Sequence, residues 1–217
     1  MNTLVTLGPT QEPLDAMRII TNRSTGELGT QLALTLMESG HHVIALRGTG
    51  STFQINSFLE RGGRVIPFTT TEDLRFQLTK LAGEESIDAV FHTAAISDFY
   101  LPEGGSGKIP TSNGSLHLSL ETTPKLLPLM KGWFPKALVT GWKFEASGTQ
   151  DGKDALSSKE QALAAGASQI SKYGTHACVV NGPSYGSGFG VLRKSGSLTH
   201  LEDRDALCYF LVENLEK

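Results

Sequence analysis

The sequence is poor in cysteine and in long apolar runs, and each shortage argues against a class of protein. Its 217 residues include two cysteines, Cys178 and Cys208, both within apolar runs. We therefore expect buried thiols rather than a disulfide or a metal site. No apolar run approaches the ~20 residues of a membrane span, and the N-terminus lacks the basic flank of a signal peptide. These absences predict a cytoplasmic protein without membrane contact.

Basic charge and several familiar catalytic patterns are also scarce. The 22 acidic and 19 basic side chains give a net charge of −3, which argues against a protein that coats nucleic acid. The six histidines show no metal-ligand spacing, and neither a P-loop nor a Gly-x-Ser-x-Gly elbow occurs. The apolar content of 39% is ordinary for a globular protein, and the length favours one domain over residues 1–217.

Strand-like and helix-like segments alternate along the chain, which predicts a three-layer, Rossmann-like α/β fold with helices on both faces of a mostly parallel sheet. The predicted strands cover residues 4–7, 42–46, 64–68, 88–95, 136–142 and 177–181, with an edge strand at 116–120. The predicted helices cover residues 29–39, 71–81, 123–133, 157–173 and 205–216. Residues 189–193 and 196–200 predict a C-terminal hairpin.

Polar and small residues follow several of the predicted strands. In an open parallel sheet, ligands bind beyond the carboxyl ends of the strands. The residues at these strand ends include Gly8, Asp98, Lys143, Glu145 and Asn181. Each of them alone is also explained as an ordinary turn residue, since turns are rich in such types. Their coincidence at one edge of the sheet favours a binding site there.

Residues 21–29, Thr-Asn-Arg-Ser-Thr-Gly-Glu-Leu-Gly, run directly into a predicted helix. Free N–H groups and the helix dipole favour a phosphate at such a position. Gly26 and Gly29 would let a nucleotide approach the backbone closely. The segment is not a standard dinucleotide fingerprint, because the first glycine is missing and no strand directly precedes it. An ordinary helix N-cap is therefore the alternative interpretation.

Three longer motifs occur in a fixed order. They are Gly8-Pro9-Thr10-x-Glu12-Pro13-Leu14-Asp15, Arg18-Ile19-Ile20-Thr21-Asn22-x-Ser24-x-Gly26-x-x-Gly29, and Ala94-Ala95-Ile96-Ser97-Asp98-Phe99-Tyr100. Together with later segments around Lys108, Pro124, Lys143 and Val179, they resemble the phosphopantothenate–cysteine ligase family over essentially the whole chain. The resemblance implies a ligase of coenzyme A biosynthesis that joins 4'-phosphopantothenate to L-cysteine through an acyl-nucleotidylate. It also implies ATP or CTP as cosubstrate and Mg²⁺ as cofactor.

The resemblance assigns roles to the matching residues. It assigns nucleotide binding to Gly8, Ser24, Gly26, Gly29, Trp142 and Asn181. It assigns phosphopantothenate binding to Arg18, Asn22, Ala94, Ala95 and Asp98. Asn22, Lys108 and Asp98 are the expected catalytic residues. Arg18 would reach across a homodimer interface, Lys108 would lie on a mobile loop within residues 102–115, and Asp98 would be the carboxylate nearest to the metal, whose ligands stay unknown.

Some details separate subtypes and keep alternatives open. No flavin-binding segment precedes the motifs, so we expect the free-standing synthetase and no flavin. Residues 96–100, 124–127 and 142–145 resemble the ATP-using eukaryotic type, whereas the bacterial type uses CTP. Lys108 lacks the basic cluster that follows it in the bacterial type, which leaves open a homologue that binds a nucleotide or acyl phosphate without catalysis. A nicotinamide-dependent oxidoreductase is disfavoured, because Arg47 rather than an acidic residue follows the second predicted strand.

Overall fold

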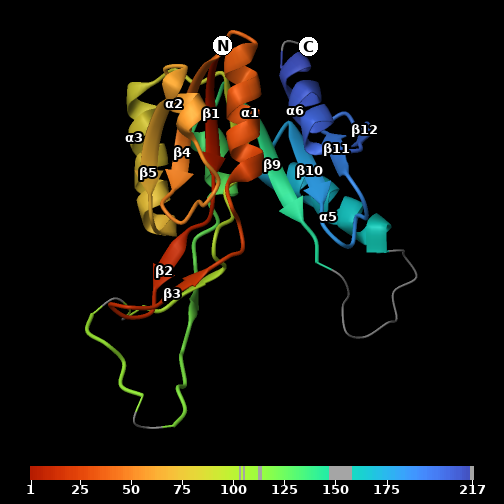
Figure 1. The fold of residues 1–217 in the computed structure, drawn as a ribbon. Coiled ribbons are helices and arrows are strands. Elements are labelled where there is room, and N and C mark those ends of the chain that lie inside the picture. The colour runs from red at the N-terminus through yellow and green to blue at the C-terminus, as the bar shows by residue number, and fades with distance from the viewer. Residues whose placement is uncertain (103, 105, 112–113, 147–157, 216–217) are drawn as a thin grey trace.

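The computed structural model describes the 217-residue chain except residues 103, 105, 112–113, 147–157 and 216–217. Its central sheet contains β1 (Asn2–Leu7), β4 (His42–Gly48), β5 (Arg64–Phe68), β6 (Ala89–His92), β9 (Leu138–Phe144), β10 (Ala177–Asn181), β11 (Phe189–Arg193) and β12 (Leu198–Leu201). Their order across the sheet is β12-β11-β10-β9-β6-β1-β4-β5 (Figure 1). The pairs from β5 to β10 are parallel, and the last two strands form the antiparallel hairpin.

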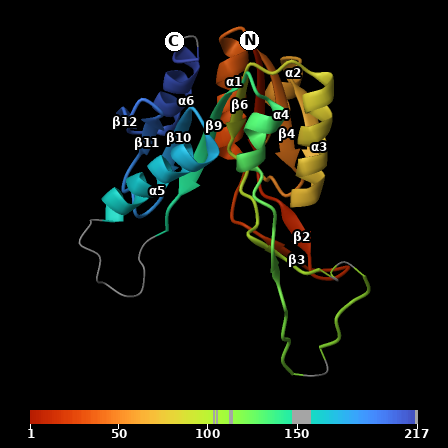
Figure 2. The ribbon, with the colours of Figure 1, turned by 180° about the vertical axis from the view of Figure 1, so that it is seen from behind.

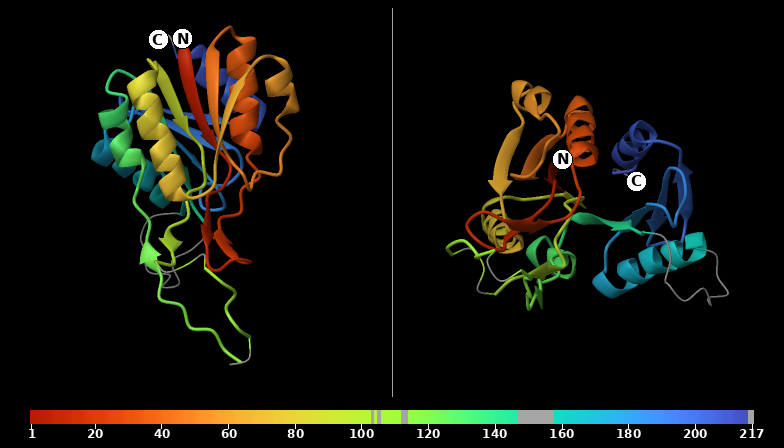
Figure 3. Two further views of the ribbon diagram at one scale, coloured as in Figure 1. Left: turned by 90° about the vertical axis from the view of Figure 1, so that its left-hand side faces the viewer. Right: turned by 60° about the horizontal axis from the view of Figure 1, so that its bottom comes forward.

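Helices cover both faces of this sheet. One face carries α1 (Glu27–Glu38), α2 (Asn56–Glu60) and α6 (Arg204–Glu213). The other face, seen in Figure 2, carries α3 (Thr71–Glu84), the short 3-10 helix η1 (Leu127–Leu129), α4 (Met130–Trp133) and α5 (Ser158–Tyr173). The right-hand view of Figure 3 shows the resulting three layers. The predicted α/β architecture and C-terminal hairpin are confirmed.

The inner strands β1, β6 and β10 are buried on both faces, as their nearly continuous apolar sequences require. In β1, Val5 packs in the core beneath α1 and α6, while Leu4 packs in the core beneath α3 and α4. Phe91 and Val90 divide between the same two cores in β6. These alternating contacts fix the central strands, whose carboxyl ends therefore meet at one edge.

Local signals place the helix ends. Gly40 has a φ of +83°, and the N–H of His41 donates to the Leu36 carbonyl at 3.0 Å, so α1 ends in the left-handed turn that glycine favours. The Thr70 side chain accepts a hydrogen bond from the N–H of Asp73 and caps α3. Asp203 caps α6 in the same way through the N–H of Ala206.

Two projections leave the carboxyl edge of the sheet, at the bottom of Figure 1. In the short projection, β2 (Gln11–Pro13) pairs with β3 (Ile19–Thr21). In the long projection, β7 (Phe99–Tyr100) pairs with β8 (Glu121–Thr122) at the base of a long loop. The sequence patterns predicted neither of these strand pairs.

The structure corrects several predicted elements. Residues 116–120 do not form an edge strand, although their apolar residues alternate, because the pairing of the long projection lies at residues 99–100 and 121–122. The helix predicted over 123–133 begins only at Leu127, since the N–H of Thr123 donates to the Asp98 carbonyl instead. The strand predicted over 88–95 ends at His92. Ser157, Gly105 and Glu216, which also belonged to predicted segments, lie outside the described residues.

Other expectations concern the whole chain. Cys178 and Cys208 are free and buried as expected, and burial raises the pKa of each thiol to about 12. Among the described residues, no helix is long and apolar enough to cross a membrane.

Candidate functional site

A pocket of about 590 Å³ lies at the carboxyl edge of the sheet, beside the N-terminus of α1. We call it the edge pocket. Its lining residues are Gly8, residues 23–29, Thr93, Phe144, Asn181, Phe189 and Arg204. Five of the six residues predicted to bind a nucleotide therefore line one cavity, namely Gly8, Ser24, Gly26, Gly29 and Asn181. The sixth, Trp142, does not belong to this lining.

The three glycines are needed by the packing of the protein itself. Gly8 and Gly26 have φ values of +80° and +79°. A Cβ atom on Gly8 would lie 1.8 Å from Ser51 Oγ, and one on Gly29 would lie 2.4 Å from Leu7 Cβ. The glycines therefore let β1, α1 and the loop after β4 meet closely, and this contact brings the start of α1 to the end of β1.

The start of α1 is arranged for an anion. Its N-cap residue is Gly26, which offers no side chain to bond the N–H groups of the first turn. Ser24 and Thr25 precede it in the pocket wall. The N–H of Glu27 donates to Thr25 Oγ1 at 3.3 Å, and the remaining N–H groups of the first turn, with the positive end of the helix dipole, are suited to a phosphate.

Arg47 supports the loop after β4, which in turn contacts the segment before α1. Its Nη2 atom donates to the carbonyl of Ser51 at 2.8 Å and to that of Phe53 at 3.1 Å. The N–H of Phe53 in turn donates to the Thr25 carbonyl at 3.0 Å. From the sequence, Arg47 only disfavours a dinucleotide site. A cation near the carboxyl end of a buried strand was the available signal for this supporting role.

Asn181 and Trp142 both carry a buried polar atom without a hydrogen-bond partner in the part of the chain that the structure describes. For Asn181 this atom is Oδ1, an acceptor, and for Trp142 it is Nε1, a donor. Asn181 lines the edge pocket, whereas Trp142 lines a neighbouring pocket of about 240 Å³ together with Ala94, Lys125 and Lys143. Each pocket is therefore bordered by a residue with an unsatisfied buried polar atom.

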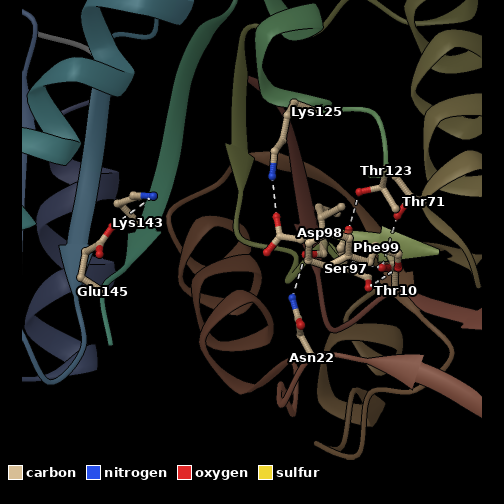
Figure 4. Close-up of polar contacts among 11 residues, drawn as sticks. Thr10, Asn22, Thr71, Ser97, Asp98, Phe99, Thr123, Lys125, Lys143 and Glu145 are labelled. Atoms are coloured by element: carbon tan, nitrogen blue, oxygen red, sulfur yellow. Dashed lines mark hydrogen bonds and ion pairs between the residues drawn. The ribbon is translucent and has the colours of Figure 1, made fainter. Parts of the chain in front are cut away.

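The residues predicted to bind phosphopantothenate at the end of β6 are held by a hydrogen-bond network (Figure 4). Asn22 Nδ2 donates to the Ile96 carbonyl at 2.7 Å, which ties residue 22 to the segment that contains Ala94 and Ala95. The N–H of Ser97 donates to Thr10 Oγ1 at 2.9 Å. Thr10, Asn22 and the 94–98 segment are thus brought together at the end of β6.

Charged side chains border this network. Asp98 is exposed and forms an ion pair with Lys125, and Lys143 pairs with Glu145 at 3.1 Å (Figure 4). Among the described residues, no group of three or more His, Cys, Asp or Glu side chains could hold a metal ion. Asp98 therefore stands as a single carboxylate rather than as part of a metal cage.

Arg18 and Lys108 lie together on the projections and do not line the edge pocket. The buried carboxylate of Asp15 joins their segments, since it accepts from the N–H of Ile109 at 3.0 Å and pairs with Arg18 Nη1 at 3.2 Å. Hydrogen bonds from backbone N–H groups, of which the one from Ile109 has the largest effect, lower the pKa of Asp15. Ala16 N–H also donates to the Gly107 carbonyl at 2.7 Å. Lys108 is therefore held beside the short projection on both sides.

His92 lies near the same edge but has a structural role. Its Nδ1 atom lies 2.8 Å from Thr6 Oγ1, and the side chain is buried. Burial lowers the pKa of His92 to about 4, so the imidazole is neutral at neutral pH.

Comparison with known proteins identifies relatives of this chain. The coenzyme A biosynthesis bifunctional protein CoaBC of Thermococcus kodakarensis is 31% identical over 82% of this chain and 40% of its own length. The human phosphopantothenate–cysteine ligase is 29% identical over 65% of this chain and 63% of its own length. The chain thus spans less than two thirds of these curated relatives.

Solved structures share the fold. The DNA/pantothenate metabolism flavoprotein from Streptococcus pneumoniae superposes with a TM-score of 0.79 at 20% identity, covering all of this chain and 98% of that one. A Cab2 mutant in complex with phosphopantothenate-cysteine has a TM-score of 0.77 at 19% identity and covers 99% of this chain and 85% of its own.

A family model settles the relationship. The model described as the DNA/pantothenate metabolism flavoprotein C-terminal domain matches residues 1–184, which include the edge pocket residues from Gly8 to Asn181. The chain therefore belongs to the family of the DNA/pantothenate metabolism flavoprotein C-terminal domain.

Proposed function

We propose that this protein is a phosphopantothenate–cysteine ligase, an enzyme of coenzyme A biosynthesis. One observation carries the proposal. In a chain of this family, five residues that the resemblance assigned to the nucleotide line a single pocket at the N-terminus of α1. The human and mouse relatives bear the name of this ligase, and a neighbour of the same fold was solved with phosphopantothenate-cysteine.

The proposed reaction has two steps. The carboxylate of 4'-phosphopantothenate attacks the α-phosphorus of the nucleotide, and pyrophosphate leaves. The amine of L-cysteine then attacks the acyl carbon, the nucleoside monophosphate leaves, and an amide forms. Neither step needs a protein nucleophile, so the chain contributes positioning and charge stabilisation.

The residues divide this work by position. The N–H groups at the start of α1 and the Ser24 side chain hold phosphate oxygens, and Asn181 offers Oδ1 to a donor of the nucleotide. Asn22 and the 94–98 segment, tied together at 2.7 Å, hold the pantothenate end beside it. Lys108 would reach the reactants only when the long projection moves from its contact with Asp15.

Several finer properties belong to the proposal. The cosubstrate is ATP or CTP with Mg²⁺, and the ion would take few protein ligands, with Asp98 at the substrate end of the site as the expected carboxylate. This fits the described residues, which offer no acidic cluster. The ion supplies neutralisation of phosphate charge. We place the enzyme in the cytoplasm and assign it no flavin.

The proposal also includes a homodimer. The two projections expose large apolar side chains, namely Met17, Ile19, Phe99, Leu116, Leu118 and Leu120. Exposed apolar side chains gathered on projections are typical of an association surface. Arg18, which lies on the short projection, would then serve the site of the partner subunit.

A coupled assay tests the activity. The protein is incubated with 4'-phosphopantothenate, L-cysteine, Mg²⁺ and either ATP or CTP, and pyrophosphate and the amide product are measured, the latter by mass. Release of both, dependent on all substrates, is expected with one of the nucleotides. Nucleotide binding without either product would instead support a non-catalytic binding homologue, the alternative that the isolated Lys108 leaves open.

A further inference from the structure

Three charged side chains line the edge pocket: Arg23, Glu27 and Arg204. Arg204, at the start of α6, forms an ion pair with Glu27 in the first turn of α1. These two helices lie side by side on the same face of the sheet (Figure 1). Arg23 is exposed, and its guanidinium forms no hydrogen bond or ion pair with the described residues. The lining therefore has one positive charge in excess, and that charge is uncommitted.

An acidic residue at the start of α1 is unfavourable for a bound triphosphate. Glu27 would repel phosphates that the first turn of α1 attracts. The ion pair removes this conflict, because Arg204 neutralises Glu27 while remaining in the pocket wall. The side chain of Arg204 is 42% exposed and that of Glu27 is 33% exposed, so solvent screens the ion pair. Arg204 can therefore exchange Glu27 for a stronger anionic partner at little cost in free energy.

We infer that Arg23 and Arg204 bear the charge of the nucleotide phosphates, and that Glu27 keeps Arg204 at the pocket rim in the ligand-free protein. This inference rests on the proposed function, because that function brings a nucleoside triphosphate into the edge pocket. Arg23 binds a phosphate directly, and Arg204 exchanges its carboxylate partner for a phosphate oxygen. Neither arginine belongs to the residues that the sequence motifs singled out.

The neighbouring pocket is the competing location for the phosphates. It also contains two cations, Lys125 and Lys143. Both are already paired, Lys125 with Asp98 and Lys143 with Glu145 at 3.1 Å. Neither carboxylate lines that pocket, and the helix that begins in its lining is the three-residue η1, whose first turn contains Pro128, a residue without an N–H. The edge pocket therefore offers the phosphates more uncommitted positive potential.

Calorimetric titration with non-hydrolysable, methylene-bridged analogues of ATP and CTP tests the inference through binding alone. Arg23→Gln and Arg204→Gln should each weaken binding about tenfold, the effect of losing one charge-assisted contact. Glu27→Gln should tighten binding about threefold, because it removes a negative charge and frees Arg204. Arg61→Gln, which breaks the surface ion pair with Glu38, is the matched control and should leave binding unchanged.

The direction of each change in affinity distinguishes an electrostatic role of the ion pair from a purely structural one. If the pair between Arg204 and Glu27 only joined two helices, both of its variants would weaken binding, and that result overturns the inference. Weakening by Lys143→Gln with no effect of Arg23→Gln also overturns it. Arg204→Lys, which keeps the charge, should bind within threefold of the wild type, and this variant covers the case in which Arg204→Gln lowers the melting temperature.

The same measurements separate this inference from the ligase proposal. A wild type that binds the analogues with the expected sign pattern but forms no amide refutes the ligase and leaves the two arginines assigned. A wild type that forms the amide while Arg23→Gln and Arg204→Gln bind and react normally refutes the arginines and leaves the ligase. A wild type that binds neither analogue overturns both.

Discussion

In the proposed site, Asn22 is a single side chain that would hold the substrate end. Its Nδ2 atom donates to the Ile96 carbonyl at 2.7 Å, a contact that an aspartate cannot make. Asn22→Asp should lower kcat/KM about tenfold or more, because it loses this contact and places a negative charge beside the reacting phosphate. The exposed position predicts little change in melting temperature.

The control for this variant is Asn2→Asp. Asn2 makes an equivalent contact, from Nδ2 to the Ser86 carbonyl at 2.9 Å, but at the opposite edge of the sheet. The activity of Asn2→Asp should match that of the wild type. Full activity of Asn22→Asp under substrate-limiting conditions would remove Asn22 from the site.

Lys108 is exposed and lies on the long projection, and its neighbours Gly107 and Ile109 are hydrogen-bonded to the short projection. Lys108→Gln should therefore lower kcat about tenfold while thermal unfolding stays unchanged. Lys80→Gln, an exposed lysine on α3, provides the matched control. A clear drop in melting temperature for Lys108→Gln would contradict its exposed placement.

His92 makes the stability of the protein depend on pH. Burial lowers its folded-state pKa to about 4 from 6.5, so the unfolded chain binds more protons between these values. Stability should therefore fall as pH decreases from 6.5 towards 4, by up to ~1.4 kcal/mol per pH unit from this residue. Urea unfolding at several pH values should show a flatter profile for His92→Gln, and an equally steep one would assign the loss elsewhere.

Gly29 shows how an element is placed. α1 packs so closely on β1 that a Cβ at Gly29 would lie 2.4 Å from Leu7 Cβ and 2.5 Å from Thr93 Oγ1. Gly29→Ala should therefore push the start of α1 away from the edge and destabilise the fold by ~1–3 kcal/mol. Thermal denaturation and nucleotide binding should both be impaired.

Gly83→Ala in α3 is the matched control, since a Cβ atom at Gly83 would meet nothing within 4 Å. The better helix propensity of alanine should stabilise α3 by up to ~1 kcal/mol. If Gly29→Ala kept its stability and nucleotide binding, α1 could shift away from β1 without disturbing the edge pocket.

At the scale of elements, the sequence predicted what burial dictates. The apolar runs of β1, β4 and β10 are confirmed as strands, because a strand covered on both faces must be largely apolar. The edge strand β5, which is only partly buried, is confirmed as well. The short strands of the projections were missed, since two or three residues carry no periodicity. The alternation at 116–120 was misleading, because Leu116, Leu118 and Leu120 are exposed rather than turned towards a core.

The site was predictable to a different degree. The resemblance identified five of the residues that line the edge pocket. Arg47, Arg23 and Arg204 were not predicted, because their contacts join segments that are distant in the sequence or depend on loop geometry. Trp142 lines the neighbouring pocket, and its role in nucleotide binding stays a prediction.

At the scale of the whole molecule, the proposed homodimer makes a prediction about Arg18. Arg18 lies on the short projection next to Asp15, away from the edge pocket of its own chain. If it serves the partner subunit, Arg18→Ala should raise the KM for phosphopantothenate about tenfold with little change in the KM for the nucleotide. Steady-state kinetics with each substrate varied in turn measures this difference.

Mixing tests whether sites are shared. Co-refolding Arg18→Ala with Asn22→Asp would create some sites with both native residues, so activity should rise above that of either variant alone. Activity that stays at the average of the two variants would place Arg18 in the site of its own subunit.

The order of strands in the sheet has a consequence for biosynthesis. The half β5-β4-β1-β6 comes from residues 2–92, and the half β9-β10-β11-β12 comes from residues 138–201. The first half can pair its strands before the second has left the ribosome. The edge pocket, however, takes Gly8 and Ser24 from the first half and Asn181 and Arg204 from the second. The proposed nucleotide would therefore bind only to the finished chain, and by contacting both halves across the seam between β6 and β9 it would protect the newly made protein from proteolysis.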